Sequence, residues 1–176
     1  SVACNGAVTA TANVTNIQGG SGNQSYLWTG GVGTQTNSFA IGLGAGNYSL
    51  FVTDLLSGCT YTQSFTITQP APLAVSISNI TNVTCAPLCN GTAQASTVGG
   101  TPGYTYTITA PGIIDVTGNI SGLCAGNYTV TATDAAGCTG TTSFTVTQAP
   151  ALNVNVSNIN NVTCNGLCNG SAQAVS

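Results

Sequence analysis

Eight cysteines are the side chains of this 176-residue sequence with the most chemical potential. They are Cys4, Cys59, Cys85, Cys89, Cys124, Cys138, Cys164 and Cys168. Cysteines at this density indicate metal or redox chemistry in a cytosolic protein and disulfides in a secreted β-rich one. Cys85 with Cys89, and Cys164 with Cys168, are each separated by three residues, which leaves zinc binding as the alternative to disulfides.

The sequence has almost none of the other side chains that catalysis needs. It contains no Lys, Arg or His, and its charged side chains are Asp54, Asp115 and Asp134. A Ser or Cys nucleophile would therefore have no general base to activate it. Without cations the chain cannot neutralise nucleic-acid phosphates or bind an anionic membrane surface, and no apolar run approaches the roughly 20 residues of a membrane span. We predict no enzyme activity, no cofactor, no nucleic-acid partner and no membrane insertion.

The three aspartates have a simpler structural explanation. Asp54 and Asp134 each end a predicted strand and precede a turn that contains Gly and Cys. A carboxylate in this position caps backbone N–H groups in an Asx turn. The alternative is calcium, which usually takes about six to eight oxygen ligands, several of them carboxylates. One aspartate per turn favours the cap, so we predict no metal site, and we expect Asp115 to be a solvated strand or turn residue.

Alternating apolar and polar residues predict strands along the whole chain. In one example Tyr128, Val130 and Ala132 alternate with Thr129 and Thr131. The composition is 42% hydrophobic and 2% charged, so the chain can bury a core although charge contributes little to its solubility. Short alternating runs with a turn every 8–12 residues or so are typical of Ig-like sandwiches. The predicted fold is all-β, with tandem Ig-like antiparallel β-sandwich repeats of about 80 residues.

An internal repeat divides the chain. Residues 82–95 return at 161–174, an offset of 79 residues. We therefore predict an Ig-like repeat at 1–70 that lacks its first strand, a complete Ig-like repeat at 71–149, and the opening strands of a third repeat at 150–176. A fragment as short as the last one cannot form its own core, so we expect material outside this chain to complete it.

The complete repeat resembles a known family. Gly-Gly-Thr-Pro-Gly-Tyr-Thr-Tyr at 99–106, Gly-Leu-Cys-Ala-Gly-Asn-Tyr-Thr-Val at 122–130 and Thr-Asp-Ala-Ala-Gly-Cys at 133–138 resemble the SprB repeat. That repeat occurs in tandem in very large surface adhesins of gliding bacteria. The resemblance implies a secreted protein at the cell surface, exported by type IX secretion and connected with gliding motility, and it supplies no catalytic residues.

Comparing the two repeats predicts how the cysteines pair. Cys4 and Cys59 hold the places in the first repeat that Cys85 and Cys138 hold in the second. Cys89 and Cys124 occur in the second repeat, and both are missing from the first, which has Gly44 in place of Cys124. Two cysteines that are lost together are most simply a pair. We therefore predict the disulfides Cys4–Cys59, Cys85–Cys138 and Cys89–Cys124, and partners outside this chain for Cys164 and Cys168.

The predicted function is structural. The repeats would form an adhesin stalk or an extracellular filament at the cell surface by head-to-tail repetition, with other repeats or copies of the same protein as partners. The alternative is a carbohydrate-binding module that stacks surface glycans on aromatic rings. Its candidates are Tyr26, Trp28, Tyr48, Tyr61, Tyr104, Tyr106 and Tyr128. Most occupy inward-facing strand positions, and Tyr61 is the one most expected to be exposed.

Overall fold

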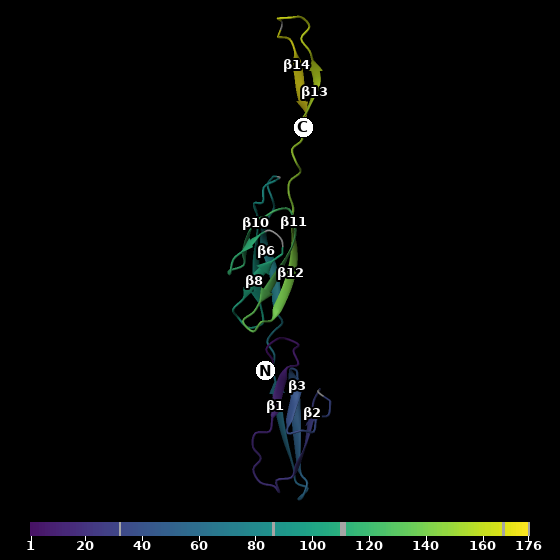
Figure 1. Cartoon of the computed structure of the whole chain (residues 1–176), viewed down its shortest axis with the longest axis vertical. Coiled ribbons are helices and arrows are strands. Elements are labelled where there is room, and N and C mark those ends of the chain that lie inside the picture. The colour runs from purple at the N-terminus through teal and green to yellow at the C-terminus, as the bar shows by residue number, and fades with distance from the viewer. Residues whose placement is uncertain (32, 86, 110–111, 167, 176) are drawn as a thin grey trace.

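The computed structural model describes residues 1–31, 33–85, 87–109, 112–166 and 168–175, which form strands and no α-helix. Two β-sandwiches follow one another along the long axis of the molecule, and a hairpin extends beyond the second (Figure 1). The described residues contain no helix long and apolar enough to cross a membrane. The tandem Ig-like, antiparallel all-β fold expected from the sequence is the observed one.

The first sandwich packs a two-stranded sheet against a three-stranded one. The sheets have the orders β1-β3 and β2-β4-β5. Their strands are β1 (Ala10–Asn13), β2 (Gln24–Thr29), β3 (Phe39–Leu43), β4 (Gly46–Asp54) and β5 (Thr60–Ile67). Between the sheets lies an apolar core that includes Trp28, Leu43, Tyr48, Leu50 and Ile67.

The second sandwich has two more strands, one at each edge, on the sheet that corresponds to β1-β3. Its sheets have the orders β6-β7-β10-β9 and β12-β11-β8. The strands are β6 (Ala74–Thr81), β7 (Gly91–Val98), β8 (Thr105–Ile108), β9 (Ile113–Ile114), β10 (Asn119–Leu123), β11 (Gly126–Thr133) and β12 (Thr139–Val146). The additional β6 pairs with β7 and places Val75 and Ile77 against the core.

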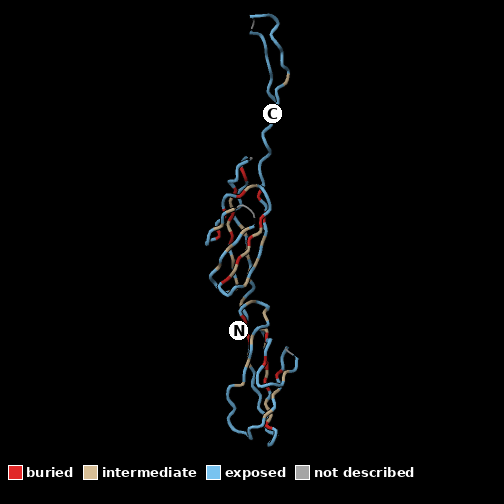
Figure 2. The backbone as a smooth tube through the Cα atoms, viewed as in Figure 1, coloured by how far each residue is buried: buried red, intermediate tan, exposed pale blue. Residues whose placement is uncertain are grey.

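The period-two pattern of the sequence explains which side chains are buried. In β11, Tyr128, Val130 and Ala132 are buried, while the neighbouring Thr side chains point to the other face. Outward Thr is a good strand residue because its branched side chain suits the pleated surface, and its hydroxyl keeps that surface polar. Buried residues accordingly lie in the interior of both sandwiches, and none of the described residues of the C-terminal hairpin is buried (Figure 2).

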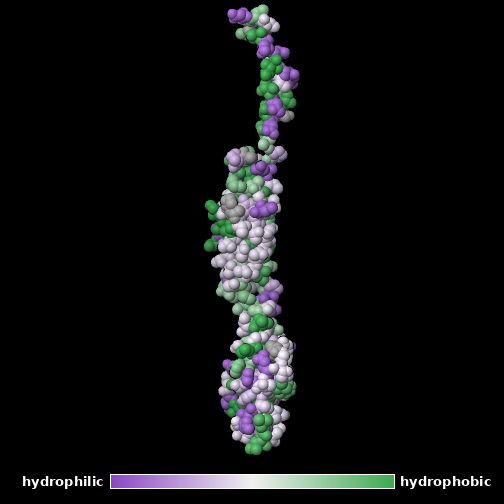
Figure 3. Space-filling view, turned by 45° about the vertical axis from the view of Figure 1, so that its right-hand side comes forward, coloured by the Kyte–Doolittle hydropathy of each residue, from purple (hydrophilic) through white to green (hydrophobic). Residues whose placement is uncertain are grey.

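The C-terminal hairpin repeats the opening of the second sandwich. It consists of β13 (Asn155–Asn160) and β14 (Ser171–Val175), which pair as β6 pairs with β7. Both β6 and β13 contain a register shift with a left-handed asparagine, Asn79 or Asn158, each with φ 51°. Apolar side chains along the hairpin stay uncovered (Figure 3), among them Val154, Val156 and Ile159.

Candidate functional site

Each sandwich has two ends that differ in sequence, and the cysteines mark them. At the head end, Val2 and Val83 donate backbone hydrogen bonds to the threonine that follows the last strand. The head cysteines, Cys4 and Cys85, lie two residues after these valines. At the turn end, the last two strands are joined by the tight turns 54–59 and 134–138. These turns carry the turn cysteines, Cys59 and Cys138.

A disulfide connects the two sandwiches. Cys4 of the first head end is bonded to Cys138 of the second turn end, with their Cα atoms 5.7 Å apart and a sequence separation of 134. The Cys138 sulfur also lies 3.5 Å from the Ala3 carbonyl oxygen. The chain N-terminus accordingly lies beside the junction between the sandwiches (Figure 1).

The predicted disulfides Cys4–Cys59 and Cys85–Cys138 are wrong in this structure. Strand β5 begins directly after Cys59 and ends beside the head segment that carries Cys4. A strand of its eight residues is about 27 Å long, whereas bonded cysteines need Cα atoms within about 7 Å. The eight residues of β12 separate Cys85 from Cys138 in the same way. Cys59 and Cys85 are free and exposed.

The other predicted pair is bonded within the second sandwich. Cys89 and Cys124 form a disulfide at the head end, with a sequence separation of 35. Cys164 and Cys168 in the hairpin are free and exposed. Among the described residues, no group of three or more potential metal ligands comes together.

The residues around the junction hold the Cys4 loop in place. The Asn5 side chain donates a hydrogen bond of 3.0 Å to the Pro70 carbonyl oxygen, and the Gly6 N–H donates one of 2.8 Å to the Gln69 side chain. The loop is therefore fixed to the chain segment that leads into the second sandwich. An open pocket of about 430 Å³ also lies at the junction, and Cys4 and Cys138 help to line it.

Asp134 shapes the turn that presents Cys138. Its carboxylate accepts hydrogen bonds from the N–H groups of Thr101, at 2.8 Å, and of Cys138, at 2.8 Å. It also accepts one from Ala136, and the Asp134 side chain is only 5% exposed. These donors, that of Thr101 first, hold the pKa of the carboxyl below its usual range. The aspartate thus fixes both the turn and the neighbouring loop.

Asp54 has the same role in the first sandwich. It accepts hydrogen bonds from the backbone N–H groups of Ser21, Ser57 and Leu56, and the Ser21 donor contributes most to lowering its pKa. The free carboxylate oxygens that a calcium site would require are therefore occupied by N–H donors in both turns. Asp115 caps its own turn: the Thr117 hydroxyl and the Asn119 N–H lower its pKa to about 2.

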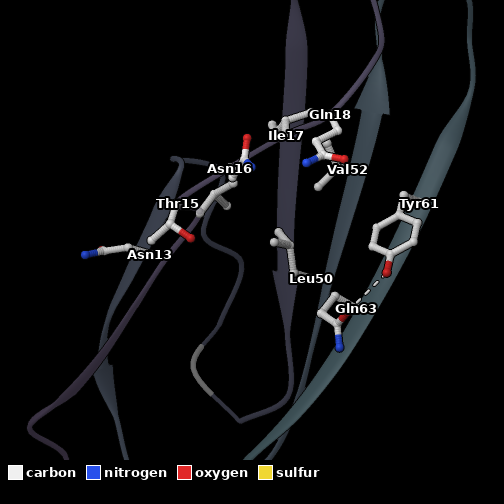
Figure 4. A pocket seen from close by; sticks show the side chains of 10 residues that line it. Asn13, Thr15, Asn16, Ile17, Gln18, Leu50, Val52, Tyr61 and Gln63 are labelled. Carbon is white, nitrogen blue, oxygen red and sulfur yellow. Dashed lines mark hydrogen bonds between the residues drawn. The ribbon is translucent and has the colours of Figure 1, made fainter.

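An open groove lies on the first sandwich. It has a volume of about 640 Å³ and is lined by residues 13–18 together with Leu50, Val52, Tyr61 and Gln63. Figure 4 shows the Tyr61 ring beside the groove, with its hydroxyl directed at Gln63. In the second sandwich β6 covers the corresponding surface, and Gly140 stands at the position of Tyr61, close to the Leu73 backbone. The groove is thus the surface that a first strand covers in the second sandwich.

The remaining aromatic candidates are buried or partly buried in the sandwiches. Trp28, Tyr48 and Tyr128 are buried, and Tyr26 and Tyr106 pack against the cores from partly buried positions. The half-buried Tyr104 donates its hydroxyl to the Gly99 carbonyl oxygen at 2.7 Å. Of the seven rings, Tyr61 is the exposed one, with 65% of its surface accessible.

Comparison with known protein families supports the resemblance found in the sequence. The fold is that of tandem Ig-like sandwiches, and residues 77–112, which run from β6 past β8, match the family model of the SprB repeat. The resemblance seen in the sequence is therefore shown for this segment. No curated protein matches the chain.

Two solved structures are distantly similar. One is the C-terminal 282-residue fragment of intimin in complex with the intimin-binding domain of its translocated receptor. It has 16% identity and a TM-score of 0.43 over 76% of this chain and 54% of that one. The other comprises three N-terminal domains of the outer capsid protein Hoc of bacteriophage RB49, with 15% identity and a TM-score of 0.45 over 90% of this chain and 58% of that one. The chain spans just over half the length of each.

Proposed function

We propose that this chain is a non-enzymatic structural region of a large extracellular surface protein, in which repeats are joined head to tail as an adhesin stalk or filament. Its units are the segments 1–70, 71–149 and 150–176. The observation that carries the proposal is the Cys4–Cys138 bond, because it joins one repeat to the next rather than closing a repeat on itself. A second covalent connection beside the peptide linker restricts how far two neighbouring sandwiches can bend or rotate.

The chemistry of the surface agrees with this role. A disulfide of this kind persists in oxidising, extracellular surroundings. The net charge is −3 and no cation is present, so electrostatic repulsion between neighbouring repeats is small. The partners are accordingly other repeats of the same kind, and adhesion to a further target would belong to the complete surface protein.

Imaging the native protein tests the proposal. Isolated from its source without reductant, it should form unbranched rods in electron micrographs. The axial repeat should be roughly 30–40 Å, the length of an eight-residue strand and a short linker. The Cys4→Ser/Cys138→Ser variant is the matched control and should give rods with more bending at the same repeat distance. Compact particles without an axial repeat would contradict a stalk or filament.

Carbohydrate binding is the second candidate function, and the groove of the first sandwich favours it. The groove combines the exposed Tyr61 ring with the amide side chains of Asn13, Asn16, Gln18 and Gln63, a combination that suits sugar stacking and hydroxyl recognition. Glycan-array binding that is lost in Tyr61→Ala and kept in Tyr104→Phe would support it. An array without a bound glycan would leave the structural function alone.

A further inference from the structure

The junction between the two sandwiches uses one cysteine type from each end. Cys4 is the head cysteine of the first sandwich, and Cys138 is the turn cysteine of the second. The first sandwich also has a turn cysteine, Cys59, and the second has a head cysteine, Cys85. Both are free and exposed, and they lie at the two ends that this junction leaves unused.

The backbone around Cys85 matches that around the bonded Cys4. The Cys4 carbonyl oxygen accepts a hydrogen bond of 3.1 Å from the N–H three residues later, and the Cys85 carbonyl oxygen accepts one of 2.9 Å from the same relative position. Two residues earlier, Val2 and Val83 make equivalent bonds of 3.0 and 2.9 Å to the end of the last strand. Cys85 is therefore held in the same head-end setting as a cysteine that is bonded across a junction.

The backbone around Cys59 resembles that around the bonded Cys138, in a turn that is one residue longer and in which the Cys59 N–H donates to the Ser57 hydroxyl rather than to the aspartate. In each turn the aspartate N–H donates a hydrogen bond of 2.9 Å to the carbonyl oxygen of the turn cysteine. The carboxylates of Asp54 and Asp134 bind N–H groups inside the turns and N–H groups of the adjacent loop, at Ser21 and Thr101. A turn capped by an aspartate thus carries the cysteine at both turn ends.

We propose that the Cys4–Cys138 bond is one member of a series that recurs at every junction. In this series Cys85 bonds to the turn cysteine of the repeat that follows the second sandwich. Cys59 bonds to the head cysteine of the repeat that precedes the first. This inference rests on the proposed head-to-tail array. It assigns one inter-repeat disulfide to each junction, whereas Cys89–Cys124 is an optional bond inside a repeat.

Forming each of these bonds requires an oxidant that accepts two electrons. Two thiols, one from each repeat, lose two electrons and two protons as their sulfurs join. The acceptor is a disulfide of the thiol–disulfide oxidoreductase class, which is reduced to a dithiol. Because the head and turn cysteines of one repeat lie at opposite ends of a strand of about 27 Å, they cannot bond to each other, and closure inside a repeat does not compete.

Peptide mapping of the native protein tests the series. The protein is isolated without reductant, its free thiols are blocked with N-ethylmaleimide, and it is unfolded and digested with an endoproteinase that cleaves before Asp and with chymotrypsin. We expect the Cys85 peptide linked to a turn peptide of a neighbouring repeat, and the Cys59 peptide linked to a head peptide. Recovery of Cys85 and Cys59 as maleimide adducts would overturn the proposal.

A pair of variants identifies the partner. Cys85→Ser should release one reactive thiol, located by mapping in the turn of a neighbouring repeat. The matched control, Cys89→Ser, should release Cys124 of the same repeat. If Cys85→Ser releases no thiol, the series is wrong. On a non-reducing gel, linkage along one chain leaves a single-chain band, whereas linkage between copies gives multiples that collapse on reduction.

Failure of the series can be told apart from failure of the proposed function. If the protein forms rods in the micrographs but its Cys85 and Cys59 are recovered as maleimide adducts, the disulfide series is refuted and the proposed stalk function stands. If the Cys85 and Cys59 peptides are linked but the particles show no axial repeat, the proposed stalk function is refuted.

Discussion

Removing the Cys89–Cys124 bond should destabilise the second sandwich and leave the first one unchanged. The change is the double substitution Cys89→Ser and Cys124→Ser. The bond spans 35 residues, and the loop-entropy relation gives about 4 kcal/mol for a loop of this length. For a domain of about 80 residues this corresponds to a fall in melting temperature of roughly 15–30 °C.

The molecule contains its own control for this measurement. Its single Trp, Trp28, lies in the core of the first sandwich and is 3% exposed, so Trp fluorescence follows that sandwich alone. The first sandwich has Gly44 where the second has Cys124, so the substitution removes nothing from it. Thermal unfolding followed by calorimetry and by Trp fluorescence should show one transition moving and the Trp28 transition staying in place. An unchanged calorimetric profile, or a Trp28 transition that moves equally, would refute independently folded sandwiches.

Three further predictions concern the cores, the aspartates and the groove. Leu123→Ala should cost about 2–5 kcal/mol of unfolding free energy in denaturant titrations, because the side chain is fully buried, and a cost under about 1 kcal/mol would contradict the packing described. The folded-state pKa values of Asp54 and Asp134 lie below their unfolded values near 4. The stabilisation from these carboxylates should therefore be complete above about pH 5 and be lost as the pH falls through the lowered pKa values, which melting curves between pH 7 and 2 will check. Adding the sequence of residues 71–81 ahead of Ser1 should cover the groove and raise the unfolding free energy of the first sandwich, measured by Trp28 fluorescence, by about 2 kcal/mol. The same extension with polar residues in place of its Val and Ile should leave that free energy unchanged.

The sequence predicted the fold better than it predicted the disulfides. Alternation such as that of Tyr128, Val130 and Ala132 determines which face of a strand is buried, so strands and cores follow from local pattern. The pairing of Cys4 depends on which end of the sandwich each cysteine occupies. That end follows from the direction of the strands, and matching each cysteine to its counterpart in the other repeat does not reveal it. Strand β5, which starts after Cys59 and ends beside the Cys4 segment, separates them by its whole length. Following the chain direction from strand to strand would have shown this separation.

The groove was missed for a different reason. The sequence indicated that the first repeat lacks a first strand, and it singled out Tyr61 as exposed. It could not show that residues 13–18 and Tyr61 border one cavity, because that cavity depends on how two sheets pack. Comparing the aligned positions Tyr61 and Gly140 would have indicated this uncovered surface. In the second sandwich a strand passes over Gly140, and in the first a large ring stands at the same position.

A disulfide map of this chain shows whether a covalent junction joins the neighbouring repeats. The chain has no site for trypsin, but cleavage before its three aspartates gives the fragments 1–53, 54–114, 115–133 and 134–176. After the free thiols are blocked, we expect 1–53 to be linked to 134–176 through Cys138, which chymotryptic cleavage after Phe144 separates from the hairpin cysteines. We also expect 54–114 to be linked to 115–133 through the Cys89–Cys124 bond. A bond between Cys4 and Cys59 would close the first repeat on itself and would refute the covalent junction.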